Sequence, residues 1–240
     1  MTVCTNTAVS YERDVPAATE EPDTVPDLDP DLELATEHEM FTLHQSIDVL
    51  LPGRASKVIH FTASRSGEGT STIVRALGKV LAMRLGRSVL ILDANAARPG
   101  QHIHFGVDGG TGWNDLARKG APVDAAVHRT NCQNLAISPI STAASSASAF
   151  FDACLARRIL AEFRTRFDLV LVDGSPPLCA GALTFAGSAD GVVLVVEAEK
   201  TRAPSVLRAK ASIERSGGHV LGTVLNRRRF HIPGAVYRRL

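Results

Sequence analysis

Residues 61–72 read Phe-Thr-Ala-Ser-Arg-Ser-Gly-Glu-Gly-Thr-Ser-Thr, and this stretch decides the fold. An apolar run that is rich in β-branched residues precedes it, and apolar residues at helical spacing follow it: Ile73, Leu77, Val80, Leu81 and Leu85. The pattern predicts a strand, a glycine-rich turn and a helix, in that order. Such a turn aims unpaired backbone N–H groups and the positive end of the helix dipole at one concavity, which suits a phosphate.

The turn resembles a phosphate-binding P-loop that lacks its lysine. The P-loop pattern is G-x-x-x-x-G-K-[ST], and residues 64–71 read Ser-Arg-Ser-Gly-Glu-Gly-Thr-Ser, so Thr70 stands at the lysine position. A hydrogen bond to a charged group contributes roughly 1.5–3 kcal/mol, so this loss weakens phosphate binding by on the order of 10- to 150-fold. Taken alone, residues 67–69 are equally compatible with a simple tight turn before a helix. The predicted nucleotide-contacting residues are Ser66, Gly67, Glu68, Gly69, Thr70, Ser71 and Thr72.

Composition and charge divide the chain into an arm and a body. The 240 residues are 45% hydrophobic and 5% aromatic, which is typical of a soluble globular chain with one core. Residues 1–39 hold eleven acidic side chains and one basic one, which leaves about +11 on residues 40–240. We expect a disordered acidic arm over residues 1–36, a folded domain over 37–226 and a basic tail over 227–240. The arm is either simply solvated or covers a basic face of the body, or the basic body lies near anionic lipid or another acidic partner.

Nothing in the sequence indicates secretion or a membrane span. The apolar run at 192–196 is far shorter than the ~18 residues that a membrane helix needs, and the acidic start does not resemble a signal peptide. The four cysteines show no C-x-x-C spacing. Reduced thiols and a cytoplasmic location are therefore expected.

Further strands are predicted at 88–93, 135–138, 168–173, 191–197 and 219–226, and helices at 37–51, 113–119, 150–163, 180–187 and 202–217. Continuous Val/Leu runs are typical of parallel strands that are buried on both faces. The fold class is therefore α/β, with a mostly parallel central sheet flanked by helices in three layers, as in P-loop NTPases.

Two strands end in a carboxylate, Asp93 and Asp173. Ligands of parallel sheets lie beyond the carboxyl ends of the strands, so both carboxylates should meet the loop at 64–72. Buried carboxylates are costly unless a cation pairs with them, and Mg²⁺ bound through Ser71, phosphates and water would satisfy them. The alternative for each aspartate alone is a helix cap or a turn residue.

The order of motifs resembles the cytoplasmic domain of the bacterial tyrosine autokinases of capsule and exopolysaccharide synthesis, a branch of the MinD/ParA-like P-loop class. The resemblance covers residues 39–226. Its motifs are Gly-Glu-Gly-x-Ser-Thr at 67–72, Leu-Ile-Leu-Asp-Ala-Asn-Ala-Ala-Arg-Pro at 90–99, Phe-Asp-Leu-Val-Leu-Val-Asp-Gly-Ser-Pro-Pro at 167–177, and the later strands at 189–196 and 222–226.

The resemblance implies ATP and Mg²⁺ as cofactors and assigns roles to residues. Ser71, Asp93 and Asp173 would form the metal site, with Asp93 as the catalytic carboxylate and Asp173 holding the metal's water shell. Asn226 would lie near the adenine, and Tyr237 is what remains of a C-terminal tyrosine cluster. A membrane-embedded polysaccharide co-polymerase is the implied partner, at the inner face of the membrane, and a homo-oligomer remains open.

The sequence also departs from the family pattern. Thr70 replaces the P-loop lysine, Asn95 replaces the second acid of the Asp-x-Asp pair, and Thr42 and Gln45 replace two arginines of an oligomerising helix. Arg65 occupies the position of a second lysine in MinD/ParA relatives and is one candidate replacement for the lost charge, the alternative being a solvated arginine.

Three functional readings follow. The chain is a weakened autokinase, a non-enzymatic regulator that docks the co-polymerase, or a positioning ATPase whose C-terminal arginines bind membrane or DNA. A nucleic-acid partner is not expected.

Overall fold

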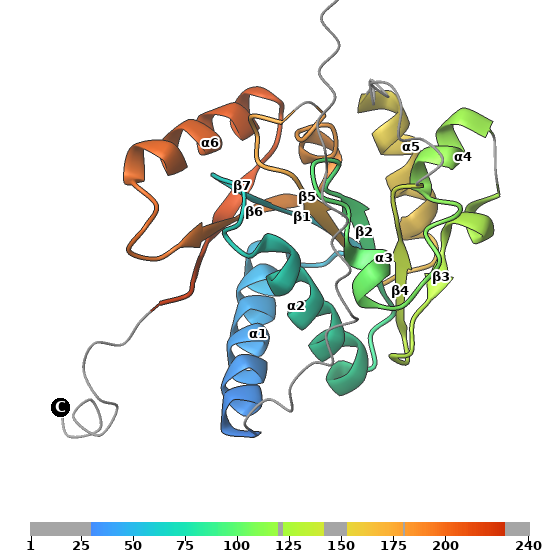
Figure 1. Cartoon of the computed structure of the whole chain (residues 1–240), viewed down its shortest axis with the longest axis horizontal. Helices are drawn as coiled ribbons and strands as arrows, with labels where there is room; N and C mark the ends of the chain where they lie inside the picture. Colours follow the sequence, from blue (N-terminus) through green and yellow to red (C-terminus); the bar gives the residue numbers. More distant parts are fainter. Residues whose placement is uncertain (1–29, 120–121, 142–152, 180, 229–240) are drawn as a thin grey trace, which may run out of the picture.

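A seven-stranded sheet forms the centre of the molecule (Figure 1). The structure, a computed structural model, describes residues 30–119, 122–141, 153–179 and 181–228. The strand order is β3-β4-β2-β5-β1-β6-β7. Only β3 runs antiparallel to its neighbour β4, and the other neighbours are parallel. The strands are β1 (Lys57–Ala63), β2 (Val89–Ala94), β3 (His128–Arg129), β4 (Leu135–Ser138), β5 (Leu169–Gly174), β6 (Gly191–Glu197) and β7 (Val220–Asn226).

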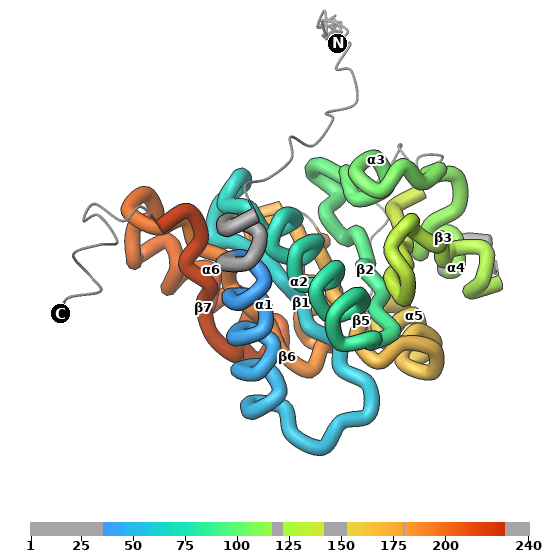
Figure 2. Tube along the Cα trace, turned by 90° about the horizontal axis from the view of Figure 1, so that it is seen from below, coloured from blue at the N-terminus to red at the C-terminus, as the bar shows by residue number. Residues whose placement is uncertain are grey.

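Helices cover both faces of this sheet. Helices α1 (Pro30–Leu50) and α2 (Thr70–Leu85) pack on one face, and α4 (Trp113–Lys119) and α5 (Ala153–Arg164) pack on the other. Helix α6 (Ala203–Arg215) covers the β6 end of that second face. Figure 2 shows α1 and α2 side by side on the same side of the strands. The described residues also contain three shorter elements: α3 (Gln101–His104), η1 (Val123–Ala126) and η3 (Ala186–Ser188).

The core explains why the strands read as continuous apolar runs. Neighbouring residues on one strand point to opposite faces, and both faces are covered. Leu90 and Ile91 of β2 are each 0% exposed, yet they belong to the cores on opposite sides of the sheet. Each such side chain contributes about 1.5–3 kcal/mol on burial. The predicted three-layer α/β architecture with a mostly parallel sheet is confirmed.

Two predicted elements differ from the structure. Helix α1 begins at Pro30, seven residues before the predicted start at Glu37, because proline is tolerated in the first turn of a helix. The helix expected at 180–187 is wrong. Gly181 has a left-handed backbone (φ +75°), and 3₁₀-type bonds such as Thr184 N–H to the Gly181 carbonyl oxygen (3.1 Å) replace helical ones.

The N-terminal part of the predicted arm (1–29) and the tail from residue 229, including Tyr237, lie outside the described residues. Across the described part of the chain, every helix is too short or too polar to cross a bilayer.

Candidate functional site

Two glycines shape the loop between β1 and α2. Gly67 and Gly69 have φ values of 90° and 93°, a backbone conformation that side chains disfavour. Gly69 is also required for space, because a Cβ atom there would lie 2.1 Å from Nδ2 of Asn226. That amide nitrogen donates a hydrogen bond to the carbonyl oxygen of Glu68 (2.9 Å). The end of β7 therefore packs directly on the glycine-rich loop.

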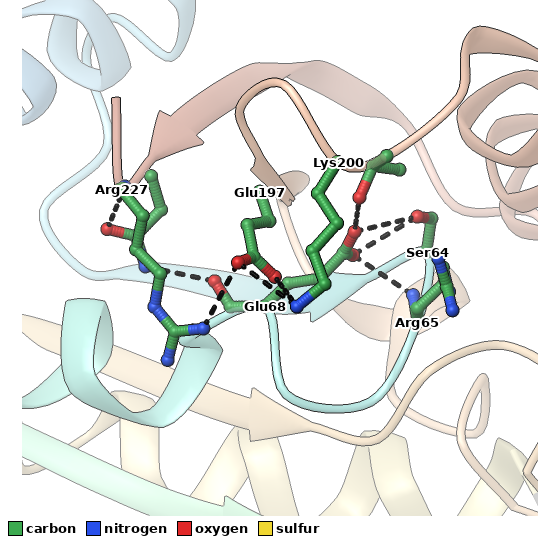
Figure 3. A network of polar contacts seen from close by, with 8 residues as sticks. Ser64, Arg65, Glu68, Glu197, Lys200 and Arg227 are labelled. Carbon is green, nitrogen blue, oxygen red and sulfur yellow. Dashed lines mark hydrogen bonds and ion pairs between the residues drawn. The ribbon is translucent and has the colours of Figure 1, made fainter. Parts of the chain in front are cut away.

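The side chain of Glu68 is folded into its own loop. It is 2% exposed and accepts hydrogen bonds from the Ser64 hydroxyl (3.1 and 3.2 Å), the Arg65 N–H (3.0 Å) and the Thr201 hydroxyl (Figure 3). Thr201 follows β6, so Glu68 joins the loop to the end of a second strand. The Glu68 carboxylate therefore braces the loop, and the predicted contact of Glu68 with a nucleotide stays a prediction.

The other predicted contacts line the loop and the start of α2. Ser66 and Gly67 are exposed, Thr70 is buried (8% exposed) and Ser71 is half-buried. Thr72 is exposed, and its hydroxyl accepts a hydrogen bond from the Arg75 guanidinium (3.3 Å). The exposed part of the loop is thus its glycine-rich turn.

Asp93 and Asp173 lie side by side. They are register partners on the parallel strands β2 and β5, and they are 0% and 1% exposed. Both carboxylates of the predicted metal site therefore lie at the same edge of the sheet. Asp93 accepts three backbone hydrogen bonds, from the N–H groups of Asn95 (3.1 Å), Gly100 (3.0 Å) and Gln101 (3.1 Å). These bonds organise the loop after β2 and the first turn of α3.

Asp173 is less well satisfied. One oxygen, Oδ2, accepts a hydrogen bond from Gln101 Nε2 (2.6 Å), while Oδ1 is buried and has no partner among the described residues. Burial and the neighbouring Asp93 raise the pKa of Asp173 to about 7, although hydrogen bonds from Ser71 and Gln101 act in the opposite direction. The Ser71 side chain therefore contacts Asp173, with which the sequence analysis placed it in one metal site.

Two polar residues that the sequence did not reveal complete this cluster. Gln101 is 1% exposed and lies between the two strand ends, with its amide also 3.4 Å from the Ser71 carbonyl oxygen. Arg75 contacts the Gln101 amide oxygen (3.5 Å), and its charge acts on both aspartates. Arg75 follows Ser71 by one helical turn, which was a usable signal. Gln101 follows an irregular stretch, and no sequence pattern indicated that it belongs to the site.

Asn95 and Trp113 hold the loops around the carboxylates. The amide oxygen of Asn95 accepts hydrogen bonds from the Ser175 hydroxyl (2.9 Å) and the Arg98 N–H (3.2 Å). Trp113 is the single tryptophan of the chain, and its indole N–H donates to the Asp93 carbonyl oxygen (2.6 Å). Its fluorescence is therefore a natural probe of this edge of the sheet.

The oxygens of Asp173 and Ser71 fit a hydrated Mg²⁺ ion, and the glycine-rich loop fits a phosphate group. Asp173 has an unpartnered buried oxygen, Oδ1, and its carboxylate also interacts with the Ser71 hydroxyl; Mg²⁺ and its waters use oxygens of this kind. A Cβ atom on Gly67 would have no other atom within 4 Å, so this part of the loop leaves room for an anion. Asn226 packs beside the loop, and its predicted contact with adenine stays a prediction.

The seven-stranded sheet, the glycine-rich loop after β1 and the carboxylates that end β2 and β5 define a P-loop NTPase fold of the MinD type. A model of the cellulose biosynthesis protein BcsQ family matches residues 56–221. The chain belongs to that family.

Relatives and solved structures agree with this assignment. The chain is 25% identical to the tyrosine-protein kinase YwqD of Bacillus subtilis over 77% of this chain and 78% of that protein. It is 27% identical to the tyrosine-protein kinase CpsD of Streptococcus agalactiae, over 75% and 79%. The kinase domain of Escherichia coli tyrosine kinase ETK has the same fold, with a TM-score of 0.69, 18% identity and coverage of 82% and 79%.

The same fold also occurs in the septum site-determining protein MinD of Pyrococcus horikoshii, which was solved with Mg-ADP. Here the TM-score is 0.61 at 20% identity, and the match covers 77% of this chain and 76% of that one. The predicted relationship to bacterial tyrosine kinases of the MinD/ParA-like class is confirmed.

Proposed function

We propose that the chain binds ATP with Mg²⁺ at the carboxyl edge of its sheet and regulates polysaccharide synthesis, with phosphoryl transfer weakened by its own sequence. The observation that carries this proposal is the juxtaposition of Ser71, Asp93 and Asp173 beside a side-chain-free glycine turn. The loop N–H groups would hold the phosphates, and Ser71 and Asp173 would hold Mg²⁺ and its waters. Bound Mg²⁺ offsets the charge that develops on the phosphoryl oxygens.

We expect weak catalysis because Thr70 and Asn95 carry no charge and Asp93 already has a structural role. Phosphoryl transfer depends on positioning and on charge stabilisation, and Thr70 supplies no charge. Asp93 accepts three backbone hydrogen bonds, so its proposed catalytic part competes with a structural one. Asn95 bridges to Ser175 and is neutral, unlike the acid of the family pattern.

The partner belongs to the same proposal. The relatives are named as tyrosine kinases, and the matching family is named for cellulose biosynthesis. A membrane-embedded polysaccharide co-polymerase at the inner face of the membrane is the partner that the sequence resemblance implies. A non-enzymatic adaptor that docks this partner is the alternative for the same fold. Tyr237 is the proposed acceptor if transfer occurs.

Changing Thr70 to lysine is expected to tighten binding of ATP with Mg²⁺ by about 10- to 150-fold, because it restores a charged contact worth roughly 1.5–3 kcal/mol. Calorimetry on the full chain measures the change. Thr165→Lys is the matched control: Thr165 is exposed after α5, at the opposite edge of the sheet, and the same added charge there should leave affinity within about twofold.

The outcomes separate the alternatives. Measurable ATP binding by the natural chain, with transfer of γ-phosphate to tyrosine, supports a kinase. Binding by Thr70→Lys alone supports the adaptor. If neither protein binds ATP with Mg²⁺, the nucleotide site itself is refuted.

A further inference from the structure

Two cations share one carboxylate beside the glycine-rich loop (Figure 3). Glu197 ends β6, and its carboxylate lies 3.2 Å from the Lys200 ammonium and 3.5 Å from the Arg227 guanidinium. The side chains of Lys200 and Arg227 are 66% and 56% exposed, whereas that of Glu197 is 15% exposed. The cations therefore face solvent while the carboxylate that holds them is largely covered. We call these three residues the Glu197 cluster.

The fold places the Glu197 cluster next to the loop. Strand β6 lies between β1 and β7, so its carboxyl end adjoins the end of β1 from which the loop departs. Glu197 is the register partner of Asn226. Figure 3 shows Lys200 and Arg227 on either side of Glu197, next to Glu68.

Each cation is tied to the loop through its neighbour in the chain. Thr201, which follows Lys200, donates a hydrogen bond to the Glu68 carboxylate. Asn226, which precedes Arg227, donates to the Glu68 carbonyl oxygen at 2.9 Å. Because both bonds end on the same loop residue, neither cation can move far from the loop while the bonds persist.

The backbone beside both cations is held in a costly conformation. Arg227 and Glu199 have φ values of 57° and 63°, in the left-handed region that residues other than glycine rarely adopt. The Arg227 N–H donates to the Asn226 side chain (2.9 Å), which fixes this geometry. Backbone strain of this kind is often retained where it positions a functional side chain.

We propose that Lys200 and Arg227 supply the phosphate-directed positive charge that Thr70 lacks, and that Glu197 holds both cations until a nucleotide displaces it. This inference rests on the proposed ATP site and adds residues to it. A nucleotide phosphate and the Glu197 carboxylate present the same chemistry to the two cations, namely oxygens that accept charge-assisted hydrogen bonds. Glu197 and the nucleotide therefore compete.

Arg65 is a further cation of the loop, and the structure supports it less well as a replacement for the missing charge. Its side chain is exposed, and its backbone N–H donates a hydrogen bond to the Glu68 carboxylate. Arg65→Gln therefore serves as a comparison within the same loop.

The first test uses calorimetry with ATP and Mg²⁺ on the full chain at low salt. We expect Lys200→Gln and Arg227→Gln each to weaken binding about threefold to tenfold, and the double variant to weaken it further. The loss should be larger for ATP than for AMP, which carries less phosphate charge. Lys210→Gln is the matched control, because Lys210 is 50% exposed and pairs with Glu214 on α6 at 3.6 Å. It should change affinity less than twofold.

The second test changes the carboxylate. Glu197→Gln should tighten ATP binding about threefold to tenfold, since it releases two cations. In the Lys200→Gln, Arg227→Gln background the same change should have no effect, because a double-mutant cycle isolates the interaction between the positions. Glu214→Gln is the matched control for removing one acidic charge. Trp113 fluorescence provides an independent binding signal.

The results distinguish this inference from the site on which it rests. If the natural chain binds ATP and the Lys200, Arg227 double variant binds equally well, the Glu197 cluster has no such function. If Glu197→Gln still tightens binding in the double-variant background, general repulsion is the cause and the proposed competition is wrong. If only Arg65→Gln weakens binding, Arg65 carries the compensation. Absence of ATP binding in both the natural chain and Thr70→Lys refutes the nucleotide site instead.

Discussion

Replacing Asp173 with asparagine is expected to raise the free energy of unfolding at pH 8 by about 2–4 kcal/mol and to abolish Mg²⁺-dependent ATP binding. A residue that serves only the fold would show the opposite change in stability. The reason lies in the environment of this carboxylate, which is 1% exposed beside a second carboxylate.

The sign follows from the pKa. Burial and Asp93 raise the pKa of Asp173 from 3.8 to about 7, so the folded state disfavours the charged form. The resulting loss of stability is absent below pH 3.8 and grows as the pH rises through 7. At about 1.36 kcal/mol for each pKa unit, the full cost is about 4 kcal/mol. Asparagine keeps an oxygen that can accept the Gln101 hydrogen bond and has no charge to bury.

Urea unfolding followed by Trp113 fluorescence measures this difference. The gain should be complete at pH 8 and small at pH 4. Asp124→Asn is the control, because Asp124 is 80% exposed and its replacement should change stability by about 0.5 kcal/mol or less. A less stable Asp173→Asn variant at pH 8 would contradict the argument from burial, and retained Mg²⁺ dependence would contradict the role at the metal.

The sequence predicted the strands well because burial on both faces leaves a strong pattern. The bounds of β4 and β6 agree with the predicted ranges. The proximity of Asp93 and Asp173 was also predictable, because each ends an apolar run and parallel strands present their carboxyl ends at one edge.

The contacts that decide charge balance at the site were not predictable. Gln101 belongs to a four-residue helix after an irregular loop, where no periodicity indicates which side chain turns inward. The hydrogen bonds from Thr201 and Ser64 to the Glu68 carboxylate were also not predicted. Thr201 lies 133 positions away in sequence, so only tertiary structure brings the two together.

The Glu197 cluster beside the loop was also not predictable from the sequence. Glu197 ends β6 and Arg227 directly follows the adjacent strand β7, where it has a left-handed backbone and pairs with Glu197. A sequence pattern does not report φ. Helix α1 began earlier than expected for a related reason, since Pro30 alone is compatible with both a break and a helix start.

Lowering the pH from 6.5 to 4 is expected to cost the fold about 3 kcal/mol through His60. His60 lies on β1, is 0% exposed, and both its ring nitrogens lack a partner among the described residues. Burial lowers its pKa from 6.5 to about 4. A lowered histidine pKa contributes stability that is complete above pH 6.5 and is lost as the pH falls through 4, because the unfolded chain takes up the proton first.

Urea unfolding at pH 7, 6, 5 and 4.5 tests this expectation, with His60→Phe and His60→Leu as variants without the titrating ring. The readout is the slope of stability against pH, so an imperfect fit of either side chain does not obscure it. Asp173 acts with the opposite sign between pH 3.8 and about 7, so the comparison is made in the Asp173→Asn background. His44 and His104, whose pKa values are also lowered, remain in every variant and cancel.

Equal slopes with and without His60 would show that its ring takes up a proton in the fold at its ordinary pKa. Protonation of His60 should also affect the proposed ATP site, because the His60 ring lies very close to Gly174. A Cβ atom on Gly174 would lie only 2.3 Å from His60 Nε2. His60 thus packs against the residue that follows Asp173, from the opposite face of the sheet. Solvating a protonated ring there requires the end of β5 to move, and that strand end carries the carboxylate on which the proposed Mg²⁺ site depends. In chains that keep Asp173, ATP binding below pH 5 should therefore be lost to a smaller extent in His60→Phe than with the natural histidine.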